Sequence, residues 1–320
     1  MIRLYRIGFF QQIERLYRFL QLSTRLYNTY GKAIVLRFYE PMSQHTTFKV
    51  GGPADIWIQP DSEHFLDYAK SLIKGNIPFF VLGGGSNIVV SDKGIRGTVL
   101  DTTQWGSCFV EGTDMIFRSG TRIAEAVELA AQHNLGGLAF LAGMPGTVGG
   151  AVWMNARCYG HAIAEFLETV TIIDENAALC TIPYNPQEYG YKKSPFQQRP
   201  VIIVEVRVHL YSQKEEDIRK EMLCHTHDRS IKGHYRFPCA GSVFKNNKDF
   251  SKPTGQIIEE LGLCGLRIGG AQVADYHGNI IINTGTATAT DIQSLVEYLM
   301  EQVYKRTGFR LEPEICFIGG

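Results

Sequence analysis

The chain has 320 residues, enough for two or three domains with sizeable cores, and its 32 basic side chains balance 32 acidic ones. This balance argues against a nucleic-acid-binding protein, and the lack of any apolar run near ~18 residues argues against a transmembrane segment. The seven cysteines are scattered without paired spacing, so we expect reduced thiols and a cytoplasmic location.

Residues 1–45 differ in composition from the rest of the chain. Arginines alternate with Leu, Tyr and Phe, and Glu14 is the only acidic residue before Glu40. The pattern predicts an amphipathic helix with a basic face, and it lacks the apolar core of a secretory signal. We interpret it as a helical N-terminal extension that packs on the first domain. The alternatives are that the assigned start of the chain lies too far upstream, or that the segment acts as a transit or membrane-surface segment. The arginines are Arg3, Arg6, Arg15, Arg18 and Arg25.

From Thr46 onward, the hydrophobic periodicity predicts strands alternating with helices, which indicates α/β units. There is no internal repeat and no low-complexity linker. The predicted strands are 54–59, 98–100, 116–118, 201–210 and 279–283, and the predicted helices are 62–74, 124–133, 215–229, 254–261 and 290–307.

The segment Leu82 to Val90, LGGGSNIVV, predicts a strand, a tight loop and a second strand. Three successive glycines let backbone N–H groups turn toward a ligand, which makes a cradle for an anion. The Walker phosphate loop, with its Lys-Ser/Thr pair, and the dinucleotide fingerprint both open a helix, whereas Ile88, Val89 and Val90 continue as a strand. The alternative is that the glycines only build a hairpin.

A second glycine-rich loop runs from Gly143 to Ala156, GMPGTVGGAVWMNA. Its glycines and Pro145 predict an irregular backbone, while the Thr147 hydroxyl and the Asn155 amide offer donors to a phosphate or a ring edge. Two such loops suit a long ligand with a diphosphate and a ring system, such as a dinucleotide.

Cys224-His225-Thr226-His227 contains metal-ligating residue types. No second ligand pair with suitable spacing follows, so we expect no metal site.

Three further segments contain the residue types that reduction of an acidic substrate needs. They are Tyr191-Lys192-Lys193-Ser194, PCAGSVFKN at 238–246, and LEPEICFIG at 311–319. Ser242 has no nucleophile elbow around it, which disfavours a hydrolase. Taken singly, Ser242 is typical of a turn residue and Glu314 of a surface carboxylate, so only the combination with the glycine loops indicates function.

These motifs, in this order, resemble those of the UDP-N-acetylenolpyruvoylglucosamine reductases, the flavoenzymes of bacterial peptidoglycan synthesis. The resemblance runs from about Thr46 to Gly319. It covers Thr46-Thr47-Phe48 with Gly51-Gly52, GGGSN, MPGTVGGA, the Tyr-Lys-Lys-Ser cluster, AGSVFKN, the GGAQV run at 269–273, and EPEICFIG.

The resemblance implies an α+β architecture. A two-subdomain FAD-binding fold of the vanillyl-alcohol-oxidase (PCMH) type would span 46–213, with subdomains of about 46–105 and 106–213. A smaller α/β substrate-binding domain would span 214–310, and a C-terminal strand at 311–320 would return to the FAD site.

The resemblance also implies the ligands. FAD would lie noncovalently between the two glycine loops, and NADPH would donate a hydride. The enolpyruvyl group of UDP-N-acetyl-3-O-(1-carboxyvinyl)-glucosamine would then be reduced to give UDP-N-acetylmuramate, which serves cell-wall biogenesis, cell shape and cell division. We expect a monomer. The implied FAD-binding residues are Gly83, Gly84, Gly85, Ser86, Asn87, Gly143, Pro145, Gly146, Thr147, Gly149 and Gly150.

Three residues take the family's catalytic roles by position. Hydride addition leaves negative charge spread into the substrate carboxylate, which needs a cation and an acid near its oxygens and a proton donor at the α-carbon. Lys192 would be the electrophile, Ser242 the proton donor, and Glu314 the carboxylate stabiliser. Substrate-binding positions would be Tyr191, Lys232, Lys245, Asn246 and Gln272, with a solvated loop lysine as the alternative for Lys232.

The chain departs from the family pattern at Lys192, where arginine is usual. Lysine keeps the charge but loses the planar fork that binds a carboxylate through two bonds. Either Lys192 acts as a point charge, or Lys193 or a nearby arginine takes part of the role. The fifty residues from Lys192 to Ser242 are too few for an extra substrate-covering tyrosine loop, which indicates the family's second type.

Two other functions remain as alternatives. An oxidase of the same flavoprotein fold would share the glycine loops, but it has no need of AGSVFKN and EPEICFIG together. A catalytically silent nucleotide-binding protein would lack a flavin spectrum.

Overall fold

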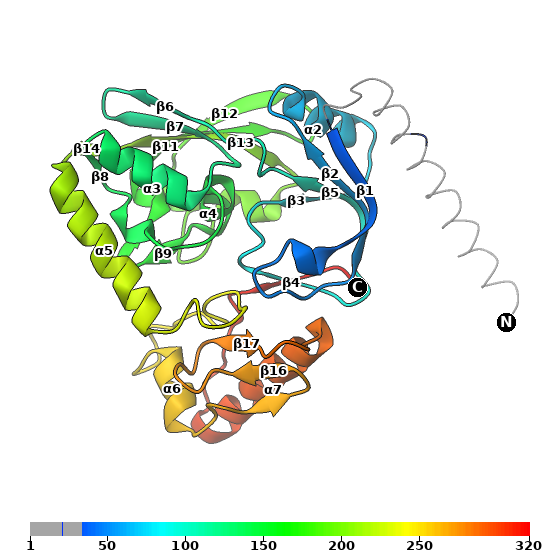
Figure 1. The fold of residues 1–320 in the computed structure, drawn as a ribbon, viewed down its shortest axis with the longest axis vertical. Coiled ribbons are helices and arrows are strands. Elements are labelled where there is room, and N and C mark those ends of the chain that lie inside the picture. The colour runs from blue at the N-terminus through cyan, green and yellow to red at the C-terminus, as the bar shows by residue number, and fades with distance from the viewer. Residues whose placement is uncertain (1–20, 22–33) are drawn as a thin grey trace, which may run out of the picture.

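The computed structural model describes residue 21 and residues 34–320, which form three units (Figure 1). The first unit is a four-stranded sheet in the order β1-β2-β5-β3, in which β2, β5 and β3 run parallel and β1 pairs antiparallel with β2. Its elements are β1 (Ile34–Pro41), η2 (Met42–Gln44), β2 (Pro53–Pro60), α2 (Phe65–Lys74), β3 (Phe79–Leu82) and β5 (Ile95–Asp101).

The first unit has the elements that the hydrophobic pattern predicts. The predicted strand at 54–59 and helix at 62–74 are confirmed as β2 and α2. Helix α2 starts late because the Asp61 carboxylate accepts the His64 N–H and holds the preceding turn. Phe65, Tyr68 and Leu72 are buried at helical spacing, so one face of α2 packs on the sheet.

Residues 34–41 differ from the predicted helical extension, because they form strand β1 at the edge of the first sheet. Exposed side chains interrupt the alternation of this strand, including the apolar Val35 and Phe38. An edge strand with apolar residues on its exposed side gives no clear two-residue pattern, which is why the sequence did not reveal it. The five arginines of the predicted basic helix lie outside the described residues.

The second unit is a five-stranded antiparallel sheet in the order β12-β11-β13-β7-β6, covered by two helices. The predicted strands at 116–118 and 201–210 are confirmed as β7 and β13, and the helix at 124–133 as α3. The elements are β6 (Cys108–Glu111), β7 (Asp114–Arg118), α3 (Ile123–Gln132), β8 (Leu135–Gly136), η3 (Ala139–Leu141), α4 (Val148–Met154), β9 (Arg157–Cys158), β10 (His161–Ala162), η4 (Ile163–Phe166), β11 (Leu167–Ile173), β12 (Leu179–Pro183), η5 (Pro186–Glu188), η6 (Pro195–Gln198), β13 (Ile202–His209) and β14 (Tyr211–Ser212).

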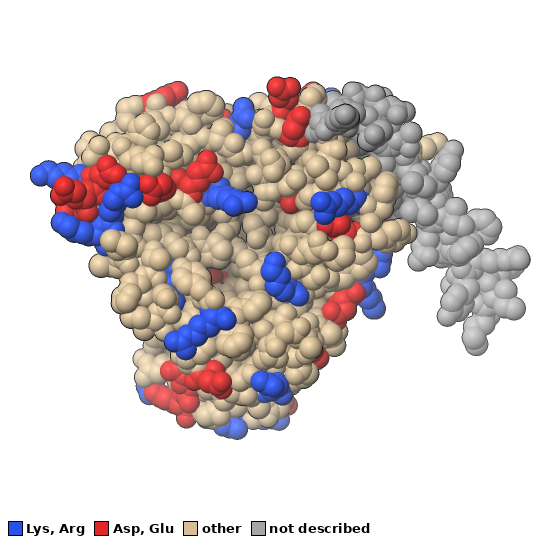
Figure 2. Space-filling view, viewed as in Figure 1, with Lys and Arg blue, Asp and Glu red and all other residues tan. Residues whose placement is uncertain are grey.

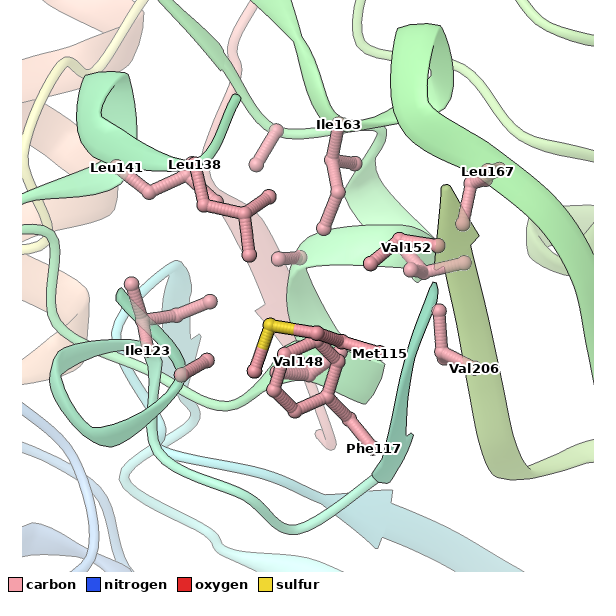
Figure 3. Packing of buried hydrophobic residues seen from close by; sticks show 14 of the residues in the cluster. Met115, Phe117, Ile123, Leu138, Leu141, Val148, Val152, Ile163, Leu167 and Val206 are labelled. Carbon is pink, nitrogen blue, oxygen red and sulfur yellow. The ribbon is translucent and has the colours of Figure 1, made fainter. Parts of the chain in front are cut away.

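The core of the second unit lies between its sheet and its helices (Figure 3). Met115 and Phe117 of β7 and Val206 of β13 meet Ile123 of α3 and Val148 of α4 there, all nearly fully buried. Helix α4 corrects the prediction of an irregular loop throughout 143–156. It forms because the Thr147 hydroxyl accepts the Gly150 N–H and caps the helix.

The third unit packs two helices on a three-stranded sheet, β15-β16-β17, in the lower part of Figure 1. The predicted helices at 254–261 and 290–307 and the strand at 279–283 are confirmed as α6, α7 and β17. Helix α7 begins with a capping box between Thr288 and Asp291 and ends at Gly308, whose φ is 76°. The elements are α6 (Thr254–Glu260), β15 (Arg267–Ile268), β16 (Ala271–Val273), β17 (Ile281–Asn283) and α7 (Ala289–Thr307).

Helix α5 (Glu215–Ile231) connects the second unit with the third. Ile218 is buried against Ala131 and Ala139 of the second unit, and the Arg219 guanidinium lies 2.8 Å from the Glu128 carboxylate. The helix therefore packs on the second unit, whereas the family resemblance implies that it belongs to a substrate domain starting at 214. We propose that the boundary lies near Gly233, after the helix.

The end of the chain returns to the first unit. Strand β18 (Cys316–Ile318) pairs parallel with β4 (Ile88–Val90), directly after the GGGSN segment. This pairing brings Glu314 beside a loop more than two hundred residues away in the sequence. Over the described residues, none of the helices combines the length and the apolar character needed to cross a membrane.

Candidate functional site

The two glycine-rich loops lie directly against each other. A Cβ atom on Gly84 would lie 2.6 Å from the Cα of Gly146, and one on Gly83 would lie 2.5 Å from the Thr147 hydroxyl. The Ser86 hydroxyl also donates to the carbonyl of Pro145 at 3.1 Å. Only glycine permits this close approach of the two backbones. The fold therefore joins the two loops into one surface.

The first glycine loop offers a row of free backbone donors. Within the described part of the chain, no N–H group of residues 83–87 donates a hydrogen bond to a protein acceptor. Gly85 has a φ of 61°, and its carbonyl accepts the Thr47 N–H at 3.1 Å, which fixes the loop. Successive unpaired N–H groups on a fixed loop suit an anion such as the pyrophosphate of a dinucleotide. The loop thus fits the group that the sequence predicts.

Part of the second loop is already engaged by the protein. The Gly149 N–H donates to the Ser119 carbonyl at 2.8 Å, and the Gly150 N–H donates to Thr147. The Gly143 carbonyl accepts the Tyr235 hydroxyl at 2.7 Å. Gly149 and Gly150 therefore shape the start of α4, whereas the N–H groups of Gly143, Gly146 and Thr147 have no acceptor among the described residues.

The Tyr191-Lys192 pair lies at the tip of a tight turn. Gly190 and Lys193 exchange two backbone hydrogen bonds of 3.1 Å, and Lys192 has a φ of 57°. A lysine in this left-handed region costs about 1 kcal/mol or more, so its surroundings must hold it. Asn155, which the sequence analysis offered to a ligand, instead donates to the Gly190 carbonyl at 2.8 Å.

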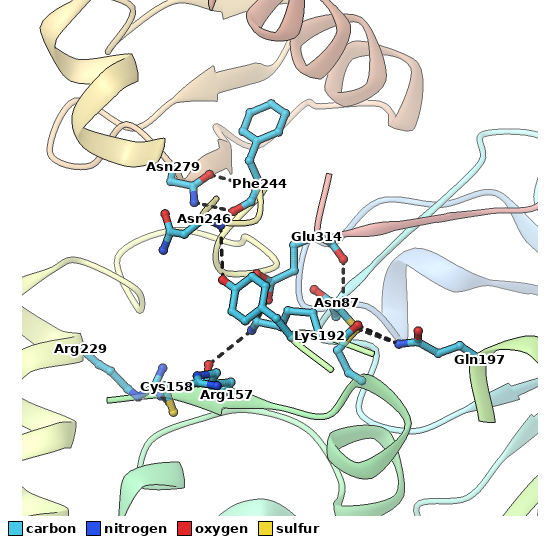
Figure 4. A network of polar contacts seen from close by, with 12 residues as sticks. Asn87, Arg157, Cys158, Lys192, Gln197, Arg229, Phe244, Asn246, Asn279 and Glu314 are labelled. Carbon is cyan, nitrogen blue, oxygen red and sulfur yellow. Dashed lines mark hydrogen bonds and ion pairs between the residues drawn. The ribbon is translucent and has the colours of Figure 1, made fainter. Parts of the chain in front are cut away.

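Lys192 and Glu314 form a shielded ion pair (Figure 4). The Lys192 Nζ lies 2.5 Å from the Glu314 Oε1, and each side chain is only 11% exposed. Burial raises the pKa of the Glu314 carboxyl above its ordinary value, although Lys192 acts in the opposite direction. Lys192 also donates to the Arg157 carbonyl at 3.4 Å, and its own carbonyl accepts the Gln197 amide. The pair therefore combines a fixed cation with a carboxyl whose pKa is raised by burial.

Glu314 is fixed by its backbone on two sides. Its carbonyl accepts the Asn87 side-chain amide at 3.1 Å, and its N–H donates to the Val243 carbonyl at 2.7 Å. Asn87, predicted as an FAD ligand, thus connects the glycine loop to Glu314. Ser242 immediately precedes Val243, and its side chain is partly exposed. The fold therefore brings the segments of Lys192, Ser242 and Glu314 together.

The residues predicted to hold substrate divide into two groups. Tyr191 belongs to the site, since its hydroxyl accepts the Asn246 N–H at 3.3 Å. The Asn246 side chain accepts the Thr254 N–H and thereby helps to hold the start of α6. The Lys245 Nζ lies 2.5 Å from a carboxylate oxygen of Glu312, two residues before Glu314. Tyr191 precedes Lys192 in the chain and Lys245 acts on Glu314 through its charge, so these residues lie close to the ion pair.

Lys232 and Gln272 are held by neighbours outside that group. The Lys232 Nζ lies 2.7 Å from the Asp228 carboxylate, which also accepts the Tyr159 hydroxyl at 2.8 Å. The Gln272 side chain accepts from Arg267 and donates to Asp275, and no contact joins it to Glu314 among the described residues.

Sequence reasoning missed Arg229, a buried residue near the end of the largely polar helix α5. Its guanidinium donates to the Ala142 carbonyl at 3.0 Å and lies 5.4 Å from the centre of the Tyr159 ring. It therefore supports the start of the second loop, because Ala142 directly precedes Gly143. The polar sequence of α5 gives no sign of this, because burial of one arginine depends on the neighbouring unit.

The surface around the site is hollowed. On the face drawn in Figure 2, a depression lies between the upper part of the molecule and the lower lobe, and Lys and Arg side chains lie beside it. A basic border attracts anionic ligands. Over the described residues, no three His, Cys, Asp or Glu side chains are arranged to hold a metal ion.

Comparison with known proteins first gives the class. Residues 55–182, which contain both glycine loops, match a family described as "FAD binding domain". Residues 233–318 match "UDP-N-acetylenolpyruvoylglucosamine reductase, C-terminal domain". The chain therefore combines an FAD-binding domain with the C-terminal domain of a reductase, and the predicted α+β fold is confirmed.

Individual relatives agree with this class. A UDP-N-acetylenolpyruvoylglucosamine reductase of Borrelia garinii subsp. bavariensis is 38% identical over 92% of this chain and 97% of its own length. The enzyme of that name from Treponema denticola is 39% identical over 89% and 94%. A crystal structure of UDP-N-acetylenolpyruvylglucosamine reductase from Thermus caldophilus superposes with a TM-score of 0.75 at 32% identity, covering 89% of this chain and 98% of that one.

This chain belongs to the UDP-N-acetylenolpyruvoylglucosamine reductase family and is an FAD-dependent oxidoreductase.

Proposed function

We propose that this protein uses NADPH to reduce the enolpyruvyl group of UDP-N-acetyl-3-O-(1-carboxyvinyl)-glucosamine, forming UDP-N-acetylmuramate for peptidoglycan synthesis. The observation that carries the proposal is the shielded Lys192–Glu314 pair, which lies next to the segment of Ser242 and is bonded to the end of the glycine loop. The family relatives named above support the same reaction.

The first glycine loop is the proposed seat of the FAD pyrophosphate, because its N–H groups have no other acceptor in the described chain. Gly146 and Pro145 would border the cofactor on the other side, since they touch the first loop. When bound, FAD supplies a hydride acceptor for NADPH and a hydride donor for the substrate.

The protein side chains stabilise the charge that develops during reduction. As a hydride adds to the terminal carbon, negative charge spreads into the substrate carboxylate. The Lys192 ammonium is the proposed cation for that carboxylate, and Glu314 in its protonated form donates a hydrogen bond to it. The raised pKa of Glu314 favours this protonated form.

Ser242 is the proposed donor of the proton that the α-carbon receives. The transfer would convert the enolpyruvyl group into a lactyl ether, with one hydride and one proton added. Among the described side-chain hydrogen bonds, none engages the Ser242 hydroxyl, which leaves it free for this role.

The remaining residues hold the substrate. Tyr191, Lys245 and Asn246 lie close to the ion pair, while Lys232 lies beside Tyr159 and would bind the diphosphate after leaving Asp228. Gln272 would act through the position of β16 rather than through Glu314. We propose that the protein works in the cytoplasm as a monomer, is of the family's second type, and serves cell shape and division.

The absorption spectrum of the purified protein tests the proposal. Under anaerobic conditions the flavin bands should bleach with NADPH and recover when the enolpyruvyl sugar nucleotide is added. UDP-N-acetylglucosamine, which lacks the enolpyruvyl group, should not restore them, and NADH in place of NADPH gives the cofactor preference. Peroxide formation without recovery by substrate would indicate an oxidase, and a colourless protein that binds no FAD would indicate a silent nucleotide-binding protein.

A further inference from the structure

The carboxylate of Asp92 makes one of the contacts between the first unit and the third. Asp92 lies in the turn after β4, and its two oxygens accept the N–H groups of Ala289 at 2.8 Å and Thr290 at 2.9 Å. The Thr290 hydroxyl also donates to it at 2.6 Å. These bonds connect residues almost two hundred positions apart.

Asp92 completes the cap of helix α7. The capping box of the third unit uses the N–H groups of Thr288 and Asp291, which leaves those of Ala289 and Thr290 unpaired. The carboxylate from the first unit accepts both of them. The bonds from Thr290 and Ala289 keep the pKa of Asp92 below its ordinary value against the effect of burial, so it is charged at neutral pH.

The turn that carries Asp92 is itself rigidly held. The Ser91 N–H donates to the Ile318 carbonyl of β18 at 2.8 Å, and the Ser91 carbonyl accepts the N–H groups of Gly52 at 2.9 Å and Gly94 at 2.8 Å. A Cβ atom on Gly52 would lie 2.1 Å from the Asp92 carbonyl. The turn therefore cannot follow α7 if the third unit moves.

The turn lies between the elements that form the site. Strand β4 starts directly after the glycine loop, and β18 follows Glu314 by one residue. Helix α7 shares a buried cluster with Val243 and Phe244, which follow Ser242. Asp92 thus connects the glycine loop and Glu314 on one side with the body that carries Ser242 on the other.

We propose that Asp92 is a positioning residue, which sets the third unit so that Ser242 lies at a fixed distance from the glycine loop and Glu314. This inference rests on the proposed function for its kinetic readout. Displacement of a reacting group by about 1 Å lowers a rate strongly, so loss of the Asp92 bonds should affect turnover more than cofactor binding.

The variant D92A tests the proposal, with T288A as a matched control. Thr288 caps the same helix from within the third unit, so T288A weakens α7 without touching the connection between units. We expect D92A to slow reoxidation of the reduced flavin by the enolpyruvyl substrate about tenfold and to raise KM for that substrate, with FAD affinity unchanged. T288A should lower Tm by about 2–4 °C and leave both kinetic values near those of the wild type. D92N keeps one acceptor oxygen and should fall between D92A and the wild type.

Amide hydrogen exchange at residues 44–52 gives a readout independent of activity. This segment contacts the third unit through the Phe48 carbonyl, so D92A should raise its exchange and T288A should not. Wild-type kinetics in D92A, or equal effects of D92A and T288A, would overturn the proposal. If the wild type does not reduce the enolpyruvyl substrate, the proposed function fails, and the exchange data alone then decide whether Asp92 positions the third unit.

Discussion

The third unit meets the other two units through junctions of opposite character. Its junction with the first unit is largely buried, since Phe48, Val50 and Val89 share a core cluster with α7, and the Asn283 amide donates to the Phe48 carbonyl at 3.0 Å. Its junction with the second unit includes the Tyr191–Asn246 bond, the Tyr235–Gly143 bond and the connector at Gly233, and the Lys192–Glu314 pair lies beside it. One junction stabilises the fold, and the other contains the groups proposed for the chemistry.

This difference places the proposed reaction where the third unit is least constrained. Gly233 has a φ of 76°, and a Cβ atom there would lie 2.3 Å from the Tyr276 ring, so the connector tolerates only glycine. A few polar contacts can exchange with ligand groups more readily than a buried apolar cluster can. We expect substrate to enter by this second junction.

Of the variants at the two junctions, the one at Lys192 should have the largest effect on activity. The variant K192A should lower substrate reduction by about 10³-fold or more, because it removes the cation and leaves Glu314 buried without a partner. FAD content should stay the same, since the glycine loops are untouched. Steady-state kinetics measure substrate reduction, and the flavin spectrum measures FAD content. K193A, which alters the exposed neighbour in the same turn, should retain activity, and full turnover in K192A would contradict the role of the second junction.

A substitution in the junction between the first and third units should instead lower the stability of the fold. Phe48 is fully buried against the third unit, so F48A should cost about 3–5 kcal/mol in the free energy of unfolding. The matched control is F109A, because Phe109 is 52% exposed and its removal should cost far less. Urea denaturation followed by circular dichroism gives both values, and equal losses would show that this junction adds no stability.

Ser242 should separate the two half-reactions. In S242A the reduction of flavin by NADPH should survive, while reoxidation by the enolpyruvyl substrate should slow by about 10²-fold, because only the second step needs a proton at carbon. Stopped-flow absorbance measures each step. S251A, in the exposed turn before α6, is the control. If both steps slow equally in S242A, the serine is structural.

The smallest effect is expected from His234, which follows the Gly233 connector. Burial, with help from nearby positive charge, lowers its pKa to about 4, so the folded protein binds fewer protons than the unfolded chain between about pH 4 and 6.5. The stability that the neutral ring contributes is complete above pH 6.5 and is lost as the pH falls toward 4. The drop in Tm between pH 7 and pH 5 should be about 2–4 °C smaller in H234N than in the wild type.

A histidine outside the junction provides the control for that measurement. His133 is exposed at the end of α3, so H133N should show the same drop in Tm as the wild type. An unchanged pH profile in H234N would mean that folding does not lower the pKa of the connector histidine.

Much of the fold could be predicted because local periodicity reports burial. The helices α2, α3, α5, α6 and α7 and the strands β2, β7 and β13 all follow from the spacing of apolar residues. Strand β1 and helix α4 could not be predicted in this way. Strand β1 has apolar residues on its exposed side, and α4 begins within a run of glycines. Gly149 and Gly150 lower helix propensity, and the cap at Thr147 and burial on the sheet outweigh that cost.

The candidate site could be predicted only as a set of motifs. Residue types pointed to three separate segments, and the family resemblance implied roles for Lys192, Ser242 and Glu314 within them. The structure supplies the contacts that bring these segments together. The left-handed backbone of Lys192 and the Asp92 cap of α7 have no local signal, because each depends on residues that are distant in sequence. The same holds for Asn87, whose side chain holds Glu314 as well as bordering the glycine loop.

The pairing of β18 with β4 has a consequence for synthesis of the chain. The first unit can pair its four strands once residue 101 has left the ribosome, but β4 and the end of the glycine loop lack their partner until residue 318 follows. Domains fold as they emerge, so most of the core forms while the neighbours of the glycine loop are incomplete. A truncation that removes residues 314–320 should therefore still collapse around its main cores but fail to retain FAD.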